Sequence, residues 1–288
     1  MEHIRLDRRP SLHDPVAVVA FAGWGDAAGA ATNAARFVVR RLGARRFASM
    51  DAEPFFDFTD TRPVVRIDTS GAREVTWPSN DFFYARNPIG THDVVVAVGV
   101  EPNMRWRTFT DSYRSLFKDI GVTMAISLGA LMADVPHTRD VRVTGSAADP
   151  AVATRLDLSV SRYQGPTGIL GVLGDGFRRD GLPSVSLWAN VPHYVTTNQN
   201  PPATMALLRR LESLLDLEFD YSELRTATAR FIEEVNTAVS GNPDIGDYVR
   251  RLEESVDSGS PAPASLDQPD GDLLLDIEEF LRDQRPGD

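Results

Sequence analysis

The stretch from residue 16 to residue 42 constrains the fold more than any other part of the sequence. Its apolar run, Val16 to Phe21, is typical of a strand buried on both faces. Gly23-Trp24-Gly25-Asp26 follows, with a third glycine at Gly29, and a helical pattern then covers 30–42. Glycines between a strand and a helix mean that the backbone bends sharply or approaches something closely. This order predicts an open α/β sheet, with the turn at the carboxyl edge where ligands and partners dock.

The turn itself has two interpretations. Its glycines serve helix–sheet packing, which we favour slightly, or they form a binding loop that holds Trp24 and Asp26. A dinucleotide site fits less well, because the spacing is G-x-G-x-x-x-G. No lone acidic residue ends a second strand about 20 residues later, since Asp51 lies in an acidic string. We therefore expect no cofactor.

The next 150 residues alternate between strands and helices. A βαβ unit spans 93–128, with strands at 93–98 and 122–128 around a helix whose apolar residues run from Trp106 to Ile120. Further strands are expected at 141–144 and 185–188, with a helix at 168–179 between them. Four short strands, at 47–50, 64–67, 74–77 and 82–84, predict an antiparallel insertion or a mixed sheet edge.

Beyond Pro202 the sequence becomes helical, with three amphipathic stripes. Asn200-Pro201 and Asn242-Pro243 are typical helix starts, and Asp220 with Glu223 resembles a capping box. The sequence thus predicts an α/β domain over 1–200 and a helical extension packed on it over 201–257. A flexible Pro/Ser/Gly/Asp-rich linker is expected at 258–271 and an acidic amphipathic tail helix at 272–288. Whether that tail docks or is a disordered solubilising segment stays open.

Composition excludes several classes of function. The chain has no cysteine, so disulfides and thiolate chemistry are excluded. Lys118 is its only lysine, and no glycine loop precedes it, so no Walker motif exists. Of the net charge of −11, the segment from residue 253 onward carries −9, which leaves a nearly neutral body that is not expected to bind nucleic acid. No signal peptide and no apolar run of about 18 residues is found, which predicts a cytoplasmic protein that does not associate with membranes.

Polar residues follow the predicted parallel strands and would meet at one sheet edge. Asp26 and Glu101 form a candidate acid–base pair, and His193 is a candidate proton carrier. We favour a structural role for each: Asp26 would cap the first helix, Glu101 would cap the helix after Pro102, and His193 would lie in a proline-rich turn. The other candidate residues of these strand ends are Gly23, Trp24, Gly25, Asn103, Asn190 and Tyr194.

A second polar cluster lies in the loop Asp134-Val135-Pro136-His137-Thr138-Arg139. Its Asp134, His137 and Arg139 could bind an anion or form an internal salt-bridged loop, and the latter is favoured. The five histidines are scattered without an H-x-x-x-H spacing, so no metal site is expected. The sequence also lacks G-x-S-x-G, the nucleophile elbow of hydrolases.

Several of these motifs together resemble the proteasome assembly chaperone 2 family in its actinobacterial form. They are Gly23-Trp24-Gly25-Asp26-Ala27, Glu101-Pro102 with Arg105-Trp106, 134–139, Gly165-Pro166-Thr167-Gly168-Ile169 and 187–195. The resemblance covers about residues 12–255. It implies a three-layer α/β/α fold with a mixed, mostly parallel sheet, similar to the phosphorylase/hydrolase fold, and a C-terminal helical extension. It also implies homo-oligomers, a trimer being one candidate, and proteasome subunits as candidate partners.

Two functions remain open. The preferred one is a non-catalytic oligomeric scaffold or assembly-chaperone-like protein linked to proteasome assembly, with proteins as its partners. The alternative is a small-molecule phosphorylase- or hydrolase-like enzyme that uses Asp26, Glu101 and His193 in the cleft at the strand ends. A deep pocket holding these three within hydrogen-bond reach would favour the enzyme, and a shallow or solidly packed edge would favour the scaffold.

Overall fold

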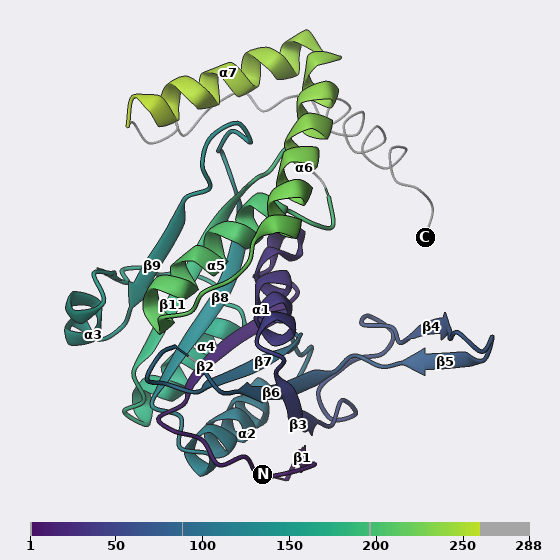
Figure 1. Cartoon of the computed structure of the whole chain (residues 1–288), viewed down its shortest axis with the longest axis vertical. Coiled ribbons are helices and arrows are strands. Elements are labelled where there is room, and N and C mark those ends of the chain that lie inside the picture. The colour runs from purple at the N-terminus through teal and green to yellow at the C-terminus, as the bar shows by residue number, and fades with distance from the viewer. Residues whose placement is uncertain (1, 88, 196, 260–288) are drawn as a thin grey trace.

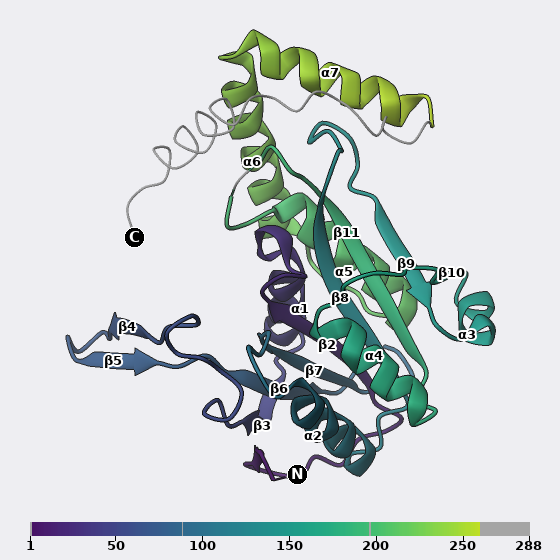
Figure 2. The same ribbon diagram turned by 180° about the vertical axis from the view of Figure 1, so that it is seen from behind.

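The computed structural model describes residues 2–87, 89–195 and 197–259 (Figure 1). Its centre is a nine-stranded sheet in the order β1-β3-β6-β7-β2-β8-β11-β9-β10. Helices cover both faces of this sheet, as the two opposite views show (Figures 1 and 2). The fold is therefore the expected three-layer α/β/α arrangement.

Four parallel strands form the middle of the sheet. They are β7 (Val94–Val100), β2 (Val16–Ala22), β8 (Met124–Ala133) and β11 (Ser184–Pro192). The first two are continuous apolar runs because helices cover both of their faces. Helix α2 (Trp106–Asp119) connects β7 to β8, which confirms the predicted βαβ unit.

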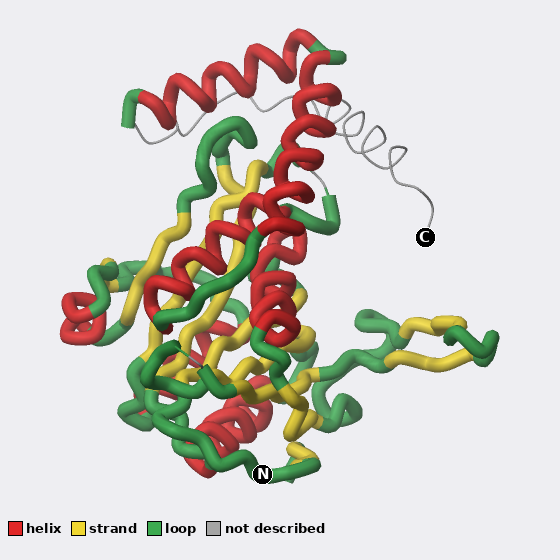
Figure 3. Tube along the Cα trace, in the orientation of Figure 1, coloured by secondary structure: helices red, strands yellow, loops and turns green. Residues whose placement is uncertain are grey.

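Both edges of the sheet are mixed. On one side β6 (Asn80–Ala85), β3 (Arg45–Met50) and β1 (Ile4–Leu6) add antiparallel strands. On the other, β9 (Val143–Ala147) is antiparallel to β11, and the two-residue β10 (Ser159–Val160) is parallel to β9. Strands β4 (Val64–Ile67) and β5 (Arg73–Thr76) form a separate hairpin that projects from the body (Figures 1 and 3).

Two apolar cores separate the three layers. Helices α1 (Ala30–Arg41), which follows a short 3₁₀ turn (Ala27–Gly29), and α5 (Pro201–Leu215) cover one face of the sheet. Helices α2 and α4 (Ile169–Arg179) cover the other. Alternate residues of β2 enter the two cores, Val18 on the α1 side and Val19 on the α2 side. A small helix, α3 (Pro150–Arg155), lies beside β9 and β10.

Helices α6 (Ser222–Ser240) and α7 (Pro243–Asp257) extend past the end of the sheet (Figure 1). They share a third apolar cluster with Tyr194 and Val195. The predicted caps Asn200 and Asn242 are confirmed, since each side chain accepts a backbone N–H bond at its helix start. The predicted capping box of Asp220 is wrong: this carboxylate bonds Ser222, while Glu223 contacts Arg41.

The predicted division of the chain at residue 200 stays a prediction. Helix α5 is one of the two helices that cover a sheet face, whereas α6 and α7 reach beyond the sheet. Of the predicted linker, only its first two residues are among those described, and the predicted tail helix at 272–288 lies outside the described residues.

Candidate functional site

The turn after β2 is shaped by the close approach of Gly23 to Glu101. Gly23 has a φ of +140°, where residues with a side chain are strained, and a Cβ placed there would lie 2.9 Å from Cβ of Glu101. Trp24 follows with 69% of its surface exposed, so the turn presents a large aromatic ring to solvent. The glycine thus serves close packing, and the tryptophan is left free for contact.

Glu101 joins this turn to a helix far along the chain. Its Oε2 accepts a hydrogen bond from the backbone N–H of Trp24 at 3.1 Å, and its Oε1 accepts one from the N–H of Ile169 at 2.7 Å. Ile169 is the first residue of α4, where a negative charge is favourable. The prediction that Glu101 caps the helix after Pro102 is therefore wrong, because it caps α4 instead.

Asp26 caps α1, as one of the two interpretations predicts. Its Oδ1 accepts from the N–H groups of Ala31 and Thr32 at 2.7 and 3.3 Å, and its Oδ2 accepts from the Thr32 hydroxyl at 2.5 Å. Burial raises the pKa of this carboxyl above its ordinary value, although these hydrogen bonds act in the opposite direction. The carboxylate is therefore committed to the helix start.

Beside this turn lies a surface groove of about 1100 Å³, which we call the strand-end groove. Trp188 and the small side chains Thr144 and Ser146 belong to the strands β11 and β9 that line it, and Arg178 on α4 lines it too. The large hydrophobic side chains exposed around it are Trp24, Leu131, Met132, Val160 and Tyr163.

Asn103 lies outside the lining of this groove. Its Oδ1 accepts hydrogen bonds from the N–H of Asp57 at 3.1 Å and the hydroxyl of Thr61 at 3.0 Å, and its Nδ2 donates to Asp60 at 2.6 Å. The side chain thus fixes the loop that leads into the β4–β5 hairpin. Its role there is structural.

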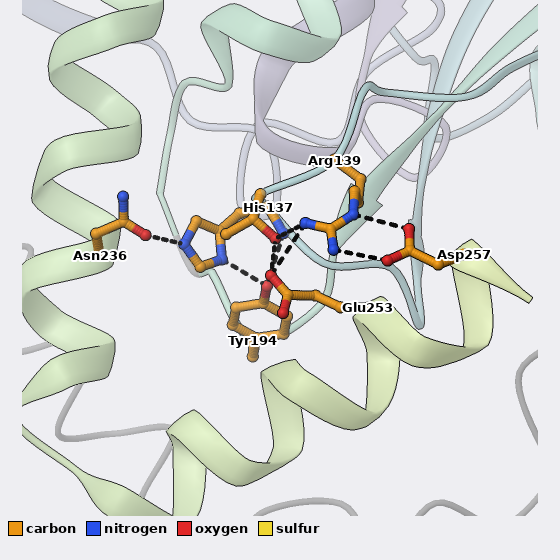
Figure 4. A network of polar contacts seen from close by, with 7 residues as sticks. His137, Arg139, Tyr194, Asn236, Glu253 and Asp257 are labelled. Carbon is orange, nitrogen blue, oxygen red and sulfur yellow. Dashed lines mark hydrogen bonds and ion pairs between the residues drawn. The ribbon is translucent and has the colours of Figure 1, made fainter.

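The second group of candidates forms a polar network between the sheet and the C-terminal helices, which we call the clamp (Figure 4). The N–H of His137 donates to the Tyr194 hydroxyl oxygen at 2.8 Å, and His137 Nδ1 lies 2.7 Å from the same oxygen. Burial raises the pKa of Tyr194, so its hydroxyl stays protonated and donates a hydrogen bond to His137 Nδ1. Nε2–H then donates to Asn236 Oδ1 on α6 at 2.9 Å.

Arg139 extends the clamp to α7. Its guanidinium donates two bonds to the carboxylate of Asp257, at 2.9 and 2.8 Å, and a third to Glu253 at 3.2 Å. The Thr138 hydroxyl also donates to Glu253 (Figure 4 draws these contacts). A bidentate arginine–carboxylate pair fixes orientation as well as distance. The loop 134–139 is therefore salt-bridged to α7, and not internally as the sequence favoured.

Asp134 and His193 form a pair at the base of the clamp. His193 Nδ1 lies 3.1 Å from Asp134 Oδ1. Its Nε2 is buried and has no hydrogen-bond partner within the described part of the chain. The rings of Tyr194 and Tyr248 approach the imidazole edge-on. A ring nitrogen enclosed in this way does not reach a substrate in solvent, so His193 is a core histidine of the turn.

Asn190 lines a second cavity, of about 540 Å³, together with His137, Arg139 and residues of α6 and α7. The candidate residues therefore fall into two places. Gly23, Trp24, Gly25 and Glu101 line the strand-end groove, with Asp26 behind it. Of the other seven, all but Asn103 lie in the clamp region, namely Asp134, His137, Arg139, Asn190, His193 and Tyr194.

Strand length separates the two places. Strand β2 ends at Ala22, and Asp26 bridges Ala130, whereas β8 and β11 continue to Ala133 and Pro192. Ala130 pairs with Ala189, so His193 lies four residues further, about 13 Å along the strand. Asp26 and Glu101 thus do not meet His193, and the predicted three-residue cleft is not assembled.

Sequence reasoning missed the clamp residues of the helices, Asn236, Glu253 and Asp257. The last two have an i, i+4 spacing that places both carboxylates on one helix face, and this is the signal that could have paired them with Arg139. Among the described residues, no group of three His, Asp or Glu side chains could hold a metal ion. Nor does the described part contain a helix with the length and apolar character to span a membrane.

The fold and these contacts define a class: a three-layer α/β/α protein whose paired C-terminal helices are fastened to the ends of the sheet by a polar clamp. The PAC2 family matches residues 20–239, and the chain belongs to that family. No match was found among curated proteins.

Solved structures of related proteins have the same fold. A PAC2 family protein from Streptomyces avermitilis is 39% identical, with a TM-score of 0.74 over 82% of this chain and 100% of its own. A proteasome-assembly chaperone homologue from Mycobacterium tuberculosis is 40% identical, with a TM-score of 0.74 over 81% of this chain and 99% of its own. PbaB of Pyrococcus furiosus, an archaeal proteasome activator, is 19% identical, with a TM-score of 0.66 over 82% and 99%, and this likeness concerns the fold alone.

Proposed function

We propose that this protein is a non-catalytic oligomeric scaffold that acts, like an assembly chaperone, on proteasome subunits. One observation carries the proposal: the polar side chains expected to do chemistry are used to hold helices. Asp26 holds α1, Glu101 holds α4, His137 holds α6 and Arg139 holds α7. A general acid or base must instead reach the proton that it transfers.

The geometry disfavours the enzyme alternative at each of its three residues. Both oxygens of Glu101 and both of Asp26 accept hydrogen bonds from the protein itself. The free nitrogen of His193 is buried. The groups also lie in two places rather than one pocket, as the lengths of β2 and β11 dictate.

The same contacts suit a scaffold, since they hold the α6–α7 pair in a fixed orientation at the end of the sheet. We place the partner-binding surface on this pair, most of whose residues face solvent outside the small cluster with Tyr194. The nature of the partner rests on the relatives, one of which is described as a proteasome-assembly chaperone homologue and another as a proteasome activator.

Reconstitution with proteasome α and β subunits of the same organism tests the proposal. We expect the protein to form a complex with α subunits on native gels and to speed the appearance of peptidase-active particles. Arg139→Ala should weaken both effects, because it releases α7 from the sheet. Arg9→Ala is the matched control, since Arg9 is also paired with an aspartate, Asp119, and lies outside both the clamp and the α6–α7 pair.

Two results would count against the scaffold. One is the absence of any complex with α or β subunits together with an unchanged assembly rate. The other is a turnover found in a metabolite screen that Glu101→Gln and Asp26→Asn both abolish while each variant stays folded at the assay temperature. The second result would establish the enzyme in its place.

A further inference from the structure

The β4–β5 hairpin, which with its flanks we call the arm (residues 62–77), is amphipathic. Paired residues of a ribbon point to the same face and alternate along it. Val65 pairs with Val75 and Ile67 with Arg73, so three aliphatic side chains share one face. Trp77, just after β5, is half exposed, and its ring contacts Phe58. The opposite face carries the pairs Val64 with Thr76 and Arg66 with Glu74.

This apolar face has no cover within the described chain. All eight residues of the two strands are exposed, Ile67 by 73%. A two-stranded hairpin alone is only marginally stable in water, and contiguous exposed apolar surface marks an interaction site. Both views show the arm reaching away from the body (Figures 1 and 2).

Exposed apolar side chains gather in one other place, the strand-end groove. Ten of the thirteen large hydrophobic side chains exposed in the described residues belong either to the arm or to the rim of this groove, five to each. Glycines of α4 line one side of the groove and project no side chain into it. A Cβ added at Gly174 would meet no atom within 4 Å. The groove is thus open to an incoming element.

The arm and the groove of one chain lie on opposite sides of the molecule. The arm leaves the sheet between β3 and β6, and the groove lies over β8, β11 and β9. The distance across the sheet from β6 to β11 is four strand spacings, about 19 Å. The arm extends from the β6 side, away from the groove (Figure 2). Figure 2 shows β4 and β5 at one side and α4, β9 and β10 at the other.

We propose that the arm of one protomer docks with its apolar face in the strand-end groove of a second copy. The inference rests on the oligomeric scaffold proposed above and names the surfaces that assemble it. The contact is head-to-tail, and such contacts close into rings when the rotation permits. A closed ring covers every arm and every groove with surfaces that the same chain supplies.

Cross-linking tests the contact directly, because the chain has no cysteine of its own. Val75→Cys on the arm and Thr144→Cys in the groove are made in separate chains, mixed, and oxidised mildly. We expect a disulfide-linked dimer from this pair. Arg209→Cys, on the exposed side of α5, is the matched control and should not link to Val75→Cys.

Three outcomes would overturn the proposal. Val75→Cys could link only to itself, which would mean an arm-to-arm contact, or it could link to nothing. Thr144→Cys could link to Ile277→Cys and not to the arm, in which case the acidic tail, not a second copy's arm, occupies the groove.

Light scattering supplies an independent measurement. Ile67→Asp, a change at an exposed position, should reduce the molar mass from that of an oligomer to 31.6 kDa, the mass of one chain. Thr76→Asp, on the polar face of the arm, should leave the oligomer unchanged. An oligomer that persists in Ile67→Asp, or a monomeric wild type, would refute the arm–groove contact. A monomeric wild type would also remove the oligomeric part of the proposed function, whereas the proteasome assay above tests the action on proteasome subunits separately.

Discussion

Replacing Asp26 measures how much the strand-end turn depends on one buried cap. Its carboxylate accepts three hydrogen bonds from Ala31 and Thr32. In Asp26→Ala the helix loses its cap, worth about 1–2 kcal/mol. The buried Thr32 hydroxyl also loses a partner, which costs about 1–3 kcal/mol. Since the Thr32 hydroxyl can turn toward the Gly29 carbonyl, 3.4 Å away, we expect a total near 3 kcal/mol.

Asp26→Asn separates the charge from the hydrogen bonds. The amide oxygen can still accept from the two N–H groups, and its nitrogen can donate to the Thr32 hydroxyl. We therefore expect a loss of about 1 kcal/mol or less near neutral pH. Its melting temperature should fall by about 2 °C, against about 6 °C for Asp26→Ala.

The pH dependence follows from the direction of the pKa shift. Burial raises the pKa of Asp26 above 3.8, so the native state keeps a proton that the unfolded chain has lost. The unfolded state binds fewer protons, and this carboxyl's contribution to stability falls as pH rises from 3.8 through the folded pKa. Asparagine has no such proton. The stability difference between the wild type and Asp26→Asn should therefore narrow as pH rises.

Urea unfolding at several pH values, followed by circular dichroism, provides the measurement. Asp220→Ala is the control, because Asp220 also bonds the start of a helix but is exposed. Hydrogen bonds from Ser222 lower the pKa of Asp220, so its contribution should be lost as pH falls, the opposite direction. A cost for Asp26→Ala below about 1 kcal/mol, or a difference from Asp26→Asn that widens with pH, would refute the reasoning.

Three further predictions concern the clamp and the groove. Burial lowers the pKa of His137 below 6.5, so the native state binds fewer protons. An NMR titration of His137 should therefore give a pKa below 6.5. As pH drops below 6.5, the free energy of unfolding of the wild type should fall more steeply than that of His137→Gln. Arg139→Ala should speed amide exchange in α7 with little change in melting temperature, whereas Arg250→Ala should not speed that exchange. In Gly129→Ala a Cβ would lie 2.5 Å from the Trp188 ring, so stability should fall by about 1–3 kcal/mol and tryptophan emission should shift.

The middle of the fold could be predicted because its signals are local. The apolar runs 16–21 and 93–98 are buried on both faces, and such continuous runs are typical of parallel strands between helical layers. The caps Asn200 and Asn242 likewise depend on residues a few positions away. The antiparallel orientation of β9 could not be predicted in this way, because it depends on pairing with β11, which lies about 40 residues later.

The distant partners of the candidate residues could not be predicted for the same reason. Glu101 precedes a helix in the sequence, which made that helix the expected one to cap. Its carboxylate instead reaches Ile169, 68 residues later, because the turn after β2 and the start of α4 both lie beside Glu101. A cap is recognised from sequence only where its helix is adjacent.

The lengths of β8 and β11 determine what the polar motifs of this chain can do together in space. If both strands ended level with β2, the histidine after β11 would face Asp26 and Glu101 across one cleft. Because they run about three residues further, the loops after them reach the C-terminal helices instead. The sheet edge is thereby divided into a groove that is open to solvent and a clamp that holds α6 and α7. A division of this kind serves a protein that positions other chains better than one that converts a small molecule.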